Sequence, residues 1–168
     1  MATTMGQPLD NASDAAIQPY AGTGLAIARL TIGAMFIWVF FENLGKGLYK
    51  PAGYAGLINY YIQHDSAPAI WKSVMAQAAA HASMAAPLQA FTEITLGVLL
   101  VLGLFTRPAA LVAFAYLGSL WISELGTSWI WELLVSVLVC LALSVGSAGR
   151  TWGLDAILAR RRPDSLLW

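Results

Sequence analysis

The fold is decided by the stretch Pro87-Leu-Gln-Ala-Phe-Thr-Glu93-Ile-Thr-Leu-Gly-Val-Leu-Leu-Val-Leu-Gly103-Leu-Phe-Thr-Arg-Pro108, which continues apolar to Trp121. It holds two hydrophobic segments joined only by the residues from Gly103 to Pro108. A connection this short allows only a tight reversal, so we predict a helical hairpin. Glu93 lies about two turns inside the first segment. A charge at that depth in an apolar span costs roughly 2.5–3.5 kcal/mol, so Glu93 is expected to face protein rather than lipid.

The composition indicates a membrane protein. Hydrophobic residues make up 58% of the chain and charged residues 11%, whereas a soluble domain carries about 25% charged residues. The formal net charge is zero, which gives no basic patch for a nucleic-acid partner. Cys140 is the single cysteine, so an intrachain disulfide and cysteine-rich metal motifs are excluded. His64 and His81 lie outside the apolar spans, so we expect neither a buried haem nor a metal site.

Four apolar segments have lengths suited to membrane helices, at about residues 20–41, 87–104, 108–123 and 129–145. We therefore predict an all-α integral membrane protein, a four-helix bundle formed by residues 20–163. Residues 1–19 carry Asp10 and Asp14 and lack a continuous apolar core, which predicts a flexible polar tail rather than a signal peptide. Residues 164–168 form the C-terminal end. Thr106 and Pro108 are expected to act as cap and first-turn residue of the third span.

The connection between the first and second spans carries a helical periodicity. Lys72 lies off the predicted apolar face. The face consists of Trp71, Val74, Met75, Ala78 and Ala82, spaced as i, i+3, i+4, i+7 and i+11. The segment is too short and too polar to span a membrane, so we predict a short amphipathic helix that lies on the membrane surface or on the bundle.

The basic residues predict the orientation. With four spans, both termini and the turn after Gly103 share one side of the membrane. That side holds Arg107, Arg150, Arg160, Arg161 and Arg162, and the other side holds Lys46, Lys50 and Lys72. The positive-inside rule then places both termini in the cytoplasm and the amphipathic helix outside it.

Arg29 allows two interpretations. If the first helix begins near Gly24, Arg29 lies close enough to its start to extend its charge to water. If the helix begins near Pro19, Arg29 lies inside the bundle and needs an acidic partner. In that second case we predict an ion pair with Glu93, formed directly or through Glu132 or a water molecule.

Several motifs together resemble the DoxX family, and within it the DoxD-like branch. They are Arg29-Leu-Thr-Ile-Gly33, Asn43-Leu-Gly-Lys46, the stretch from Glu93 to Arg107, Trp129-Ile-Trp131-Glu132 and Gly149-Arg150-Thr-Trp-Gly153-Leu-Asp155. The resemblance covers about residues 30–163 and implies a small four-helix protein of the bacterial cytoplasmic membrane. The branch implies a subunit of a thiosulfate:quinone oxidoreductase, while family membership by itself implies no particular activity.

The function therefore stays open between two classes. In the first, the protein is an accessory subunit of a larger membrane complex or a homo-oligomer, with close helix packing through small residues. In the second, it passes electrons to a membrane quinone, with Glu93 exchanging protons, Arg29 orienting it and Glu132 as a third site residue. Trp129 and Trp131 would then contact the quinone, and no cofactor would be covalently bound.

Overall fold

The computed structural model describes residues 8–163, 165 and 167, and throughout this part of the chain no strand forms. The prediction of an all-α protein is confirmed. The helices are α1 (Pro8–Gly45), α2 (Pro51–His64), α3 (Ala69–Ala80), α4 (Ala82–Leu102), α5 (Thr106–Ser123), α6 (Ile130–Val145) and α7 (Asp155–Arg161), with a 3-10 turn η1 (Ala148–Arg150) before α7.

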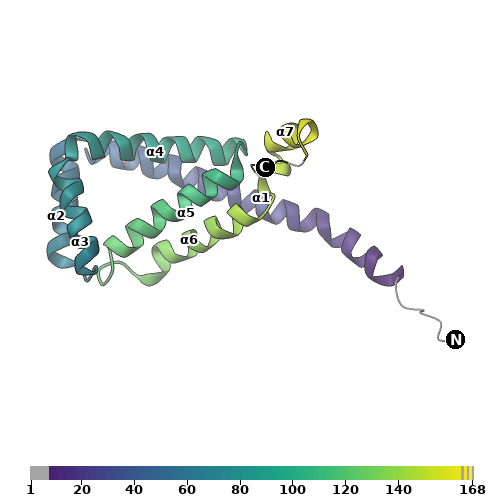
Figure 1. Cartoon of the computed structure of the whole chain (residues 1–168), viewed down its shortest axis with the longest axis horizontal. Coiled ribbons are helices and arrows are strands. Elements are labelled where there is room, and N and C mark those ends of the chain that lie inside the picture. Colours follow the sequence, from purple (N-terminus) through teal and green to yellow (C-terminus); the bar gives the residue numbers. More distant parts are fainter. Residues whose placement is uncertain (1–7, 164, 166, 168) are drawn as a thin grey trace.

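The long helices lie along one another, and the short ones lie at the two ends (Figure 1). The most extensive packing is between α1 and α4 and between α5 and α6. Helices α2 and α3 cover one end, while α7 and the start of α1 lie at the other (Figure 1). Asp155 N–H donates to the Gly103 carbonyl at 2.9 Å, and a Cβ on Gly22 would come within 2.7 Å of the Thr151 hydroxyl. The hairpin turn and both terminal regions therefore meet at one end, as the sequence predicts.

The crossing of α1 and α4 depends on two glycines. A Cβ on Gly33 would lie 2.8 Å from the Val101 backbone nitrogen, and a Cβ on Gly97 would lie 3.2 Å from the Gly33 carbonyl oxygen. Small residues let helix backbones approach this closely, which replaces the hydrophobic driving force that is missing inside a membrane. The main core lies between the four long helices, where Leu100 and Leu143 are fully buried.

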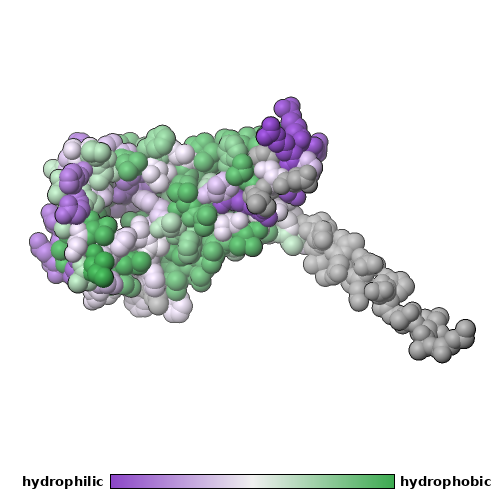
Figure 2. Space-filling view, viewed as in Figure 1, coloured by the Kyte–Doolittle hydropathy of each residue, from purple (hydrophilic) through white to green (hydrophobic). Residues whose placement is uncertain are grey.

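The outer surface of the long helices is apolar. Figure 2 shows this apolar surface over the middle of the molecule, between more polar ends. By length and composition, two segments suffice to cross a membrane, Tyr20–Gly45 and Ala82–Leu102, and Trp131–Val145 is a shorter apolar helix among the described residues.

The N-terminal boundary differs from the prediction. Helix α1 begins at Pro8 and not near Pro19 or Gly24. Proline suits a first helical position because its missing N–H would have no helical partner there. Residues 1–7 of the predicted flexible tail, and residues 164, 166 and 168 of the predicted C-terminal end, lie outside the described residues.

The connection after α1 forms two helices, α2 and α3, where one was predicted. Of the predicted apolar face, Met75 and Ala82 are buried, Ala82 belonging to α4, but Val74 is 49% exposed. Lys72, which was expected in water, is half-buried, and its Nζ donates to the Ile62 carbonyl at 2.8 Å. The prediction therefore holds for part of the face and is wrong for Val74 and Lys72, because α3 packs against α2 as well as α4 and α5 and burial does not follow one stripe.

Candidate functional site

Glu93 is the centre of a buried polar cluster. Its side chain is 1% exposed, although it lies within the apolar helix α4. Gln89, one helical turn earlier, donates from Nε2 to Oε1 at 2.9 Å. Asn43, near the end of α1, donates from Nδ2 to Oε2 at 3.2 Å. The hydroxyls of Tyr49 and Tyr116 donate to Oε2 and Oε1, respectively.

All these partners of Glu93 are neutral side chains. Within the described residues the one ion pair is between Lys46 and Glu42, at 2.5 Å on the exposed surface. Burial and the hydrogen bond to Glu93 raise the pKa of Tyr49 above its ordinary value, so its hydroxyl keeps its proton and remains a donor. Several converging donors are the arrangement that a buried carboxylate requires when no cation pairs with it.

A cavity of about 450 Å³ adjoins this cluster. One part of its lining is polar and includes Asn43, Gln89, Glu93 and Tyr116. The apolar part of the lining comes from α1, α2, α5 and α6 and includes Phe36, Leu57, Ile58, Leu117, Leu120 and Leu133. The cavity therefore combines hydrogen-bonding groups with an apolar surface, as small-molecule sites do.

The pair of helices α2 and α3 is fixed over this end by polar contacts to the turn between α5 and α6. The Ser66 N–H donates to the Leu125 carbonyl at 2.6 Å. The Trp71 indole donates to Ser123 Oγ at 2.8 Å. The Tyr61 hydroxyl donates to Glu124 Oε1 at 3.0 Å. Because α2 supplies part of the cavity lining, these contacts help to close the cavity.

The structure brings together only some of the predicted site residues. Glu93 and Glu132 both line the cavity, and Arg29 does not. Trp129 and Trp131 are 71% and 68% exposed and do not line it either, so their contact with a quinone stays a prediction.

The predicted ion pair between Arg29 and Glu93 is wrong. Arg29 is fully buried, but its Nη1 donates to the carbonyls of Leu100 and Val101 at 2.5 and 3.0 Å. Its Nη2 donates to the carbonyls of Thr151 and Trp152, at 3.4 and 3.1 Å. The last carbonyls of a helix lack helical partners and attract a cation, and the α1–α4 packing places Arg29 at that end of α4. Full burial also excludes the alternative in which the guanidinium reaches water.

Asp155 completes this second polar centre. It is fully buried, and its carboxylate accepts from the backbone N–H groups of Phe105 and Thr106 at 2.8 and 2.9 Å. Thr106, predicted to cap α5, is its first residue, and the carboxylate of Asp155 takes the capping role. A Cβ on Gly149 would collide with that carboxylate, so only glycine allows this approach. The motif from Gly149 to Asp155 therefore holds the C-terminal region against the α4–α5 turn.

Sequence reasoning missed most of the partners of Glu93. Gln89 precedes Glu93 by four residues, a spacing that places both on one helix face. Asn43 belongs to a motif that was recognised, but no role followed from it. Tyr49 and Tyr116 carry no local signal, because only the position of the α1–α2 turn and the packing of α5 beside α4 bring them to Glu93.

The comparisons with known proteins concern this same region. The DoxX family matches residues 24–123, which are 100 of the 168 residues and include Arg29 and Glu93. No curated protein and no solved structure matches the chain. The apolar helices and the family match together indicate a membrane protein. The chain belongs to the DoxX family.

Proposed function

We propose that α1, α4, α5 and α6 cross the membrane as a four-helix bundle, with both termini in the cytoplasm and α2–α3 on the other side. Helices α5 and α6 have 18 and 16 residues, or about 27 and 24 Å at the helical rise. Arg107 and the arginines of α7 lie at the end where the hairpin turn and the terminal regions meet, and the positive-inside rule assigns that end to the cytoplasm.

The bundle serves, in this proposal, as a quinone-binding subunit of a membrane oxidoreductase. The observation that carries it is the cavity beside Glu93, whose volume of about 450 Å³ lies within the range of about 300–1,000 Å³ of ligand sites. A quinone ring is flat and apolar with oxygen atoms at its edge. The apolar lining would contact the ring, and the donors of Gln89, Asn43 and Tyr116 are placed to bind its oxygen atoms.

Glu93 is the acid–base group at this site. Reduction of a quinone adds protons together with electrons, and a carboxylate within hydrogen-bonding reach can exchange one of those protons. Glu132, which also lines the cavity and is exposed, would connect Glu93 with water. The electrons would come from a partner subunit, as they would in a complex of the thiosulfate:quinone type.

Binding of a short-chain quinone to the purified protein tests this function. Glu93→Gln should weaken binding at least tenfold, which corresponds to about 1.4 kcal/mol, because the amide nitrogen cannot accept from the surrounding donors and so disturbs the Asn43, Gln89 and Tyr116 groups that would bind the quinone. Glu42→Gln is the matched control, since Glu42 is an exposed carboxylate that does not line the cavity. If the native protein binds no quinone, or if Glu93→Gln binds as well as the control, the proposal is wrong.

A second function, as accessory subunit in a larger assembly, is favoured by the surface of α3. Ile70 is 84% exposed and Val74 is 49% exposed, although α3 lies outside the proposed membrane spans. Apolar side chains gathered there suit a protein partner or a second copy of the chain. Ile70→Asp should release copurifying subunits from native membranes and leave quinone binding unchanged. A native protein that purifies alone at its natural abundance would contradict this role.

A further inference from the structure

We infer that the α7 end of the molecule holds a binding site for the phosphate headgroup of an anionic phospholipid, separate from the cavity at Glu93. A cavity of about 460 Å³ lies there, lined by Phe105, Leu158, Arg161, Arg162 and Leu167. Two guanidinium groups therefore share one cavity with three apolar side chains. This combination matches a ligand that carries a negative charge at one end and hydrocarbon at the other.

The fold builds this cavity through Asp155. The carboxylate binds the N–H groups of Phe105 and Thr106, so the first turn of α7 is fixed beside the start of α5. Leu158 and Arg161 are spaced as i and i+3 and share one face of α7, and Arg162 follows directly after the helix. Phe105, at a left-handed φ of 49°, lines the same cavity.

The chemistry of the lining favours a phosphate diester over other anions. Guanidinium groups bind phosphate oxygens in pairs and are less strongly hydrated than an ammonium group. On the same helix, Ile157 is 54% exposed, which adds an apolar side chain to the surface of α7. Anionic lipids are concentrated in the cytoplasmic leaflet, and basic residues next to a membrane span attract them.

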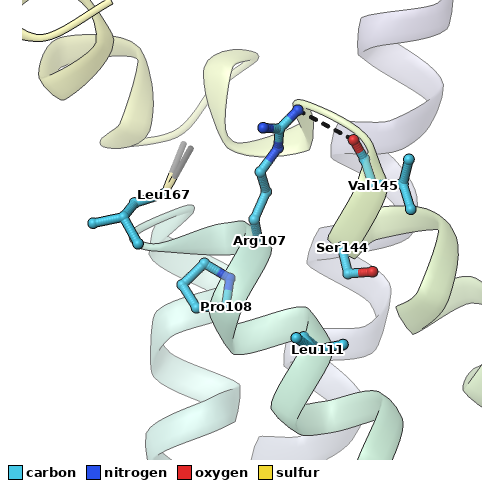
Figure 3. Close-up of a pocket in the computed structure, with 6 residues that line it drawn as sticks. All are labelled: Arg107, Pro108, Leu111, Ser144, Val145 and Leu167. Atoms are coloured by element: carbon cyan, nitrogen blue, oxygen red, sulfur yellow. Dashed lines mark hydrogen bonds between the residues drawn. The ribbon is translucent and has the colours of Figure 1, made fainter. Parts of the chain in front are cut away.

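A neighbouring cavity of about 380 Å³ shares Leu167 with this site and adds Arg107, Pro108 and Leu111 (Figure 3). In Figure 3 the guanidinium of Arg107 turns toward Val145. Its Nη2 donates to the Val145 carbonyl at 3.2 Å, and its Nε donates to the Gly146 carbonyl at 3.0 Å. Arg107 thus binds the end of α6, and Arg161 and Arg162 are the arginines that line the proposed lipid cavity. Pro108 and Leu111 prolong the apolar wall along which an acyl chain would lie.

The test compares two double variants that each remove two positive charges. Arg161→Gln with Arg162→Gln alters the cavity, whereas Arg150→Gln with Arg160→Gln alters exposed arginines that do not line it. Each protein is prepared in detergent micelles that contain phosphatidylcholine, and the rise in Tm on adding phosphatidylglycerol is measured. We expect the cavity variant to lose at least half of the native rise and the control to keep most of it.

Two further measurements make the outcome decisive. Native mass spectrometry counts the phosphatidylglycerol molecules retained by each protein, so the comparison does not depend on thermal stability alone. Inorganic phosphate replaces the lipid in a parallel titration, and it should produce less than half of the rise in Tm. An equal loss in both double variants, or an equal effect of inorganic phosphate, would overturn the inference. Quinone binding is expected to be the same in both double variants, so the outcome is independent of the function proposed for Glu93.

Discussion

Two buried polar centres of the described residues, around Glu93 and around Arg29 and Asp155, lie toward opposite ends of the molecule, and their partners differ in kind. Glu93 is bound by side chains, namely those of Asn43, Tyr49, Gln89 and Tyr116. Arg29 and Asp155 are bound by backbone groups, carbonyls for the guanidinium and N–H groups for the carboxylate. The first centre adjoins the cavity of about 450 Å³, and Arg29 and Asp155 do not line it.

This difference indicates that one centre can bind a ligand, whereas the other holds parts of the fold together. A side-chain donor can rotate from Glu93 to a ligand and back at the cost of one rotamer change. A backbone carbonyl at the end of a helix cannot turn without unwinding the helix. The Glu93 centre is therefore suited to exchange partners with a bound molecule, and the Arg29–Asp155 centre is suited to hold α1, the α4–α5 turn and the C-terminal region in one arrangement.

The largest effect is expected from Arg29→Met. The variant leaves the buried carbonyl of Leu100 and the partly buried carbonyl of Val101 without their donor, and an unsatisfied buried group costs about 1–3 kcal/mol. We expect a loss of more than about 3 kcal/mol, measured as a large drop in Tm in detergent. Arg160→Met is the matched control, because Arg160 is exposed, and it should leave Tm nearly unchanged. Equal Tm values for the two variants would show that Arg29 does not hold α1, the end of α4 and the C-terminal region together.

The sequence predicted the long helices well because their signals are local. Apolar runs of sufficient length and the Gly103–Pro108 reversal gave the positions of α4, α5 and α6 to within about five residues. Helix α2 was missed, although Tyr54, Leu57, Ile58 and Tyr61 follow the spacing i, i+3, i+4 and i+7. Gly56 and the exposed Asn59 lie between them, so the helical spacing is less evident than in the long apolar segments.

The site was predictable only in part, because it depends on how the helices are placed along one another. The cost of a buried charge identified both Arg29 and Glu93, and both are buried. Their partners could not be derived, since a shift of a few residues between α1 and α4 changes which groups meet. Arg29 also binds backbone carbonyls, which every residue carries, so no residue type could signal this contact.

A smaller loss of stability is expected from Tyr61→Phe, which tests how α2 is held over the cavity beside Glu93. The Tyr61 hydroxyl donates to Glu124 and helps to hold α2 over the cavity. Its loss should cost about 1.5–3 kcal/mol, the usual contribution of a hydrogen bond to a charged group. The drop in Tm at neutral pH is measured against Tyr60→Phe, since Tyr60 is 47% exposed. A Tyr61→Phe protein as stable as this control would show that the contact does not hold α2.

The same variant should change how stability depends on alkaline pH. Burial, and then the charge of Glu124, raise the pKa of Tyr61 above its ordinary value of about 10. Below that value both folded and unfolded chains keep the proton, so the contribution of Tyr61 is fully present. Above it the unfolded chain ionises first, and stability falls as the pH rises toward the folded pKa. Tyr61→Phe should make this loss of stability with rising pH shallower. The part of the loss that remains should come from Tyr49 and Tyr54, whose pKa values are also raised. If the slope of stability against pH were unchanged in Tyr61→Phe, Tyr61 would not be a source of this pH dependence.

The smallest expected effect is the coupling between the two centres. Arg29 and Glu93 share no hydrogen-bond partner among the described residues. Sites without shared partners usually lose stability additively, within about 0.5 kcal/mol. We therefore expect the combined variant Arg29→Met with Glu93→Gln to lose the sum of the two single losses in a double-mutant cycle on unfolding. An ion pair would give the opposite result, because removing both partners would cost less than that sum. A coupling free energy above about 1 kcal/mol would show that Arg29 and Glu93 belong to one interacting network, and the separate roles given to the two centres would be wrong.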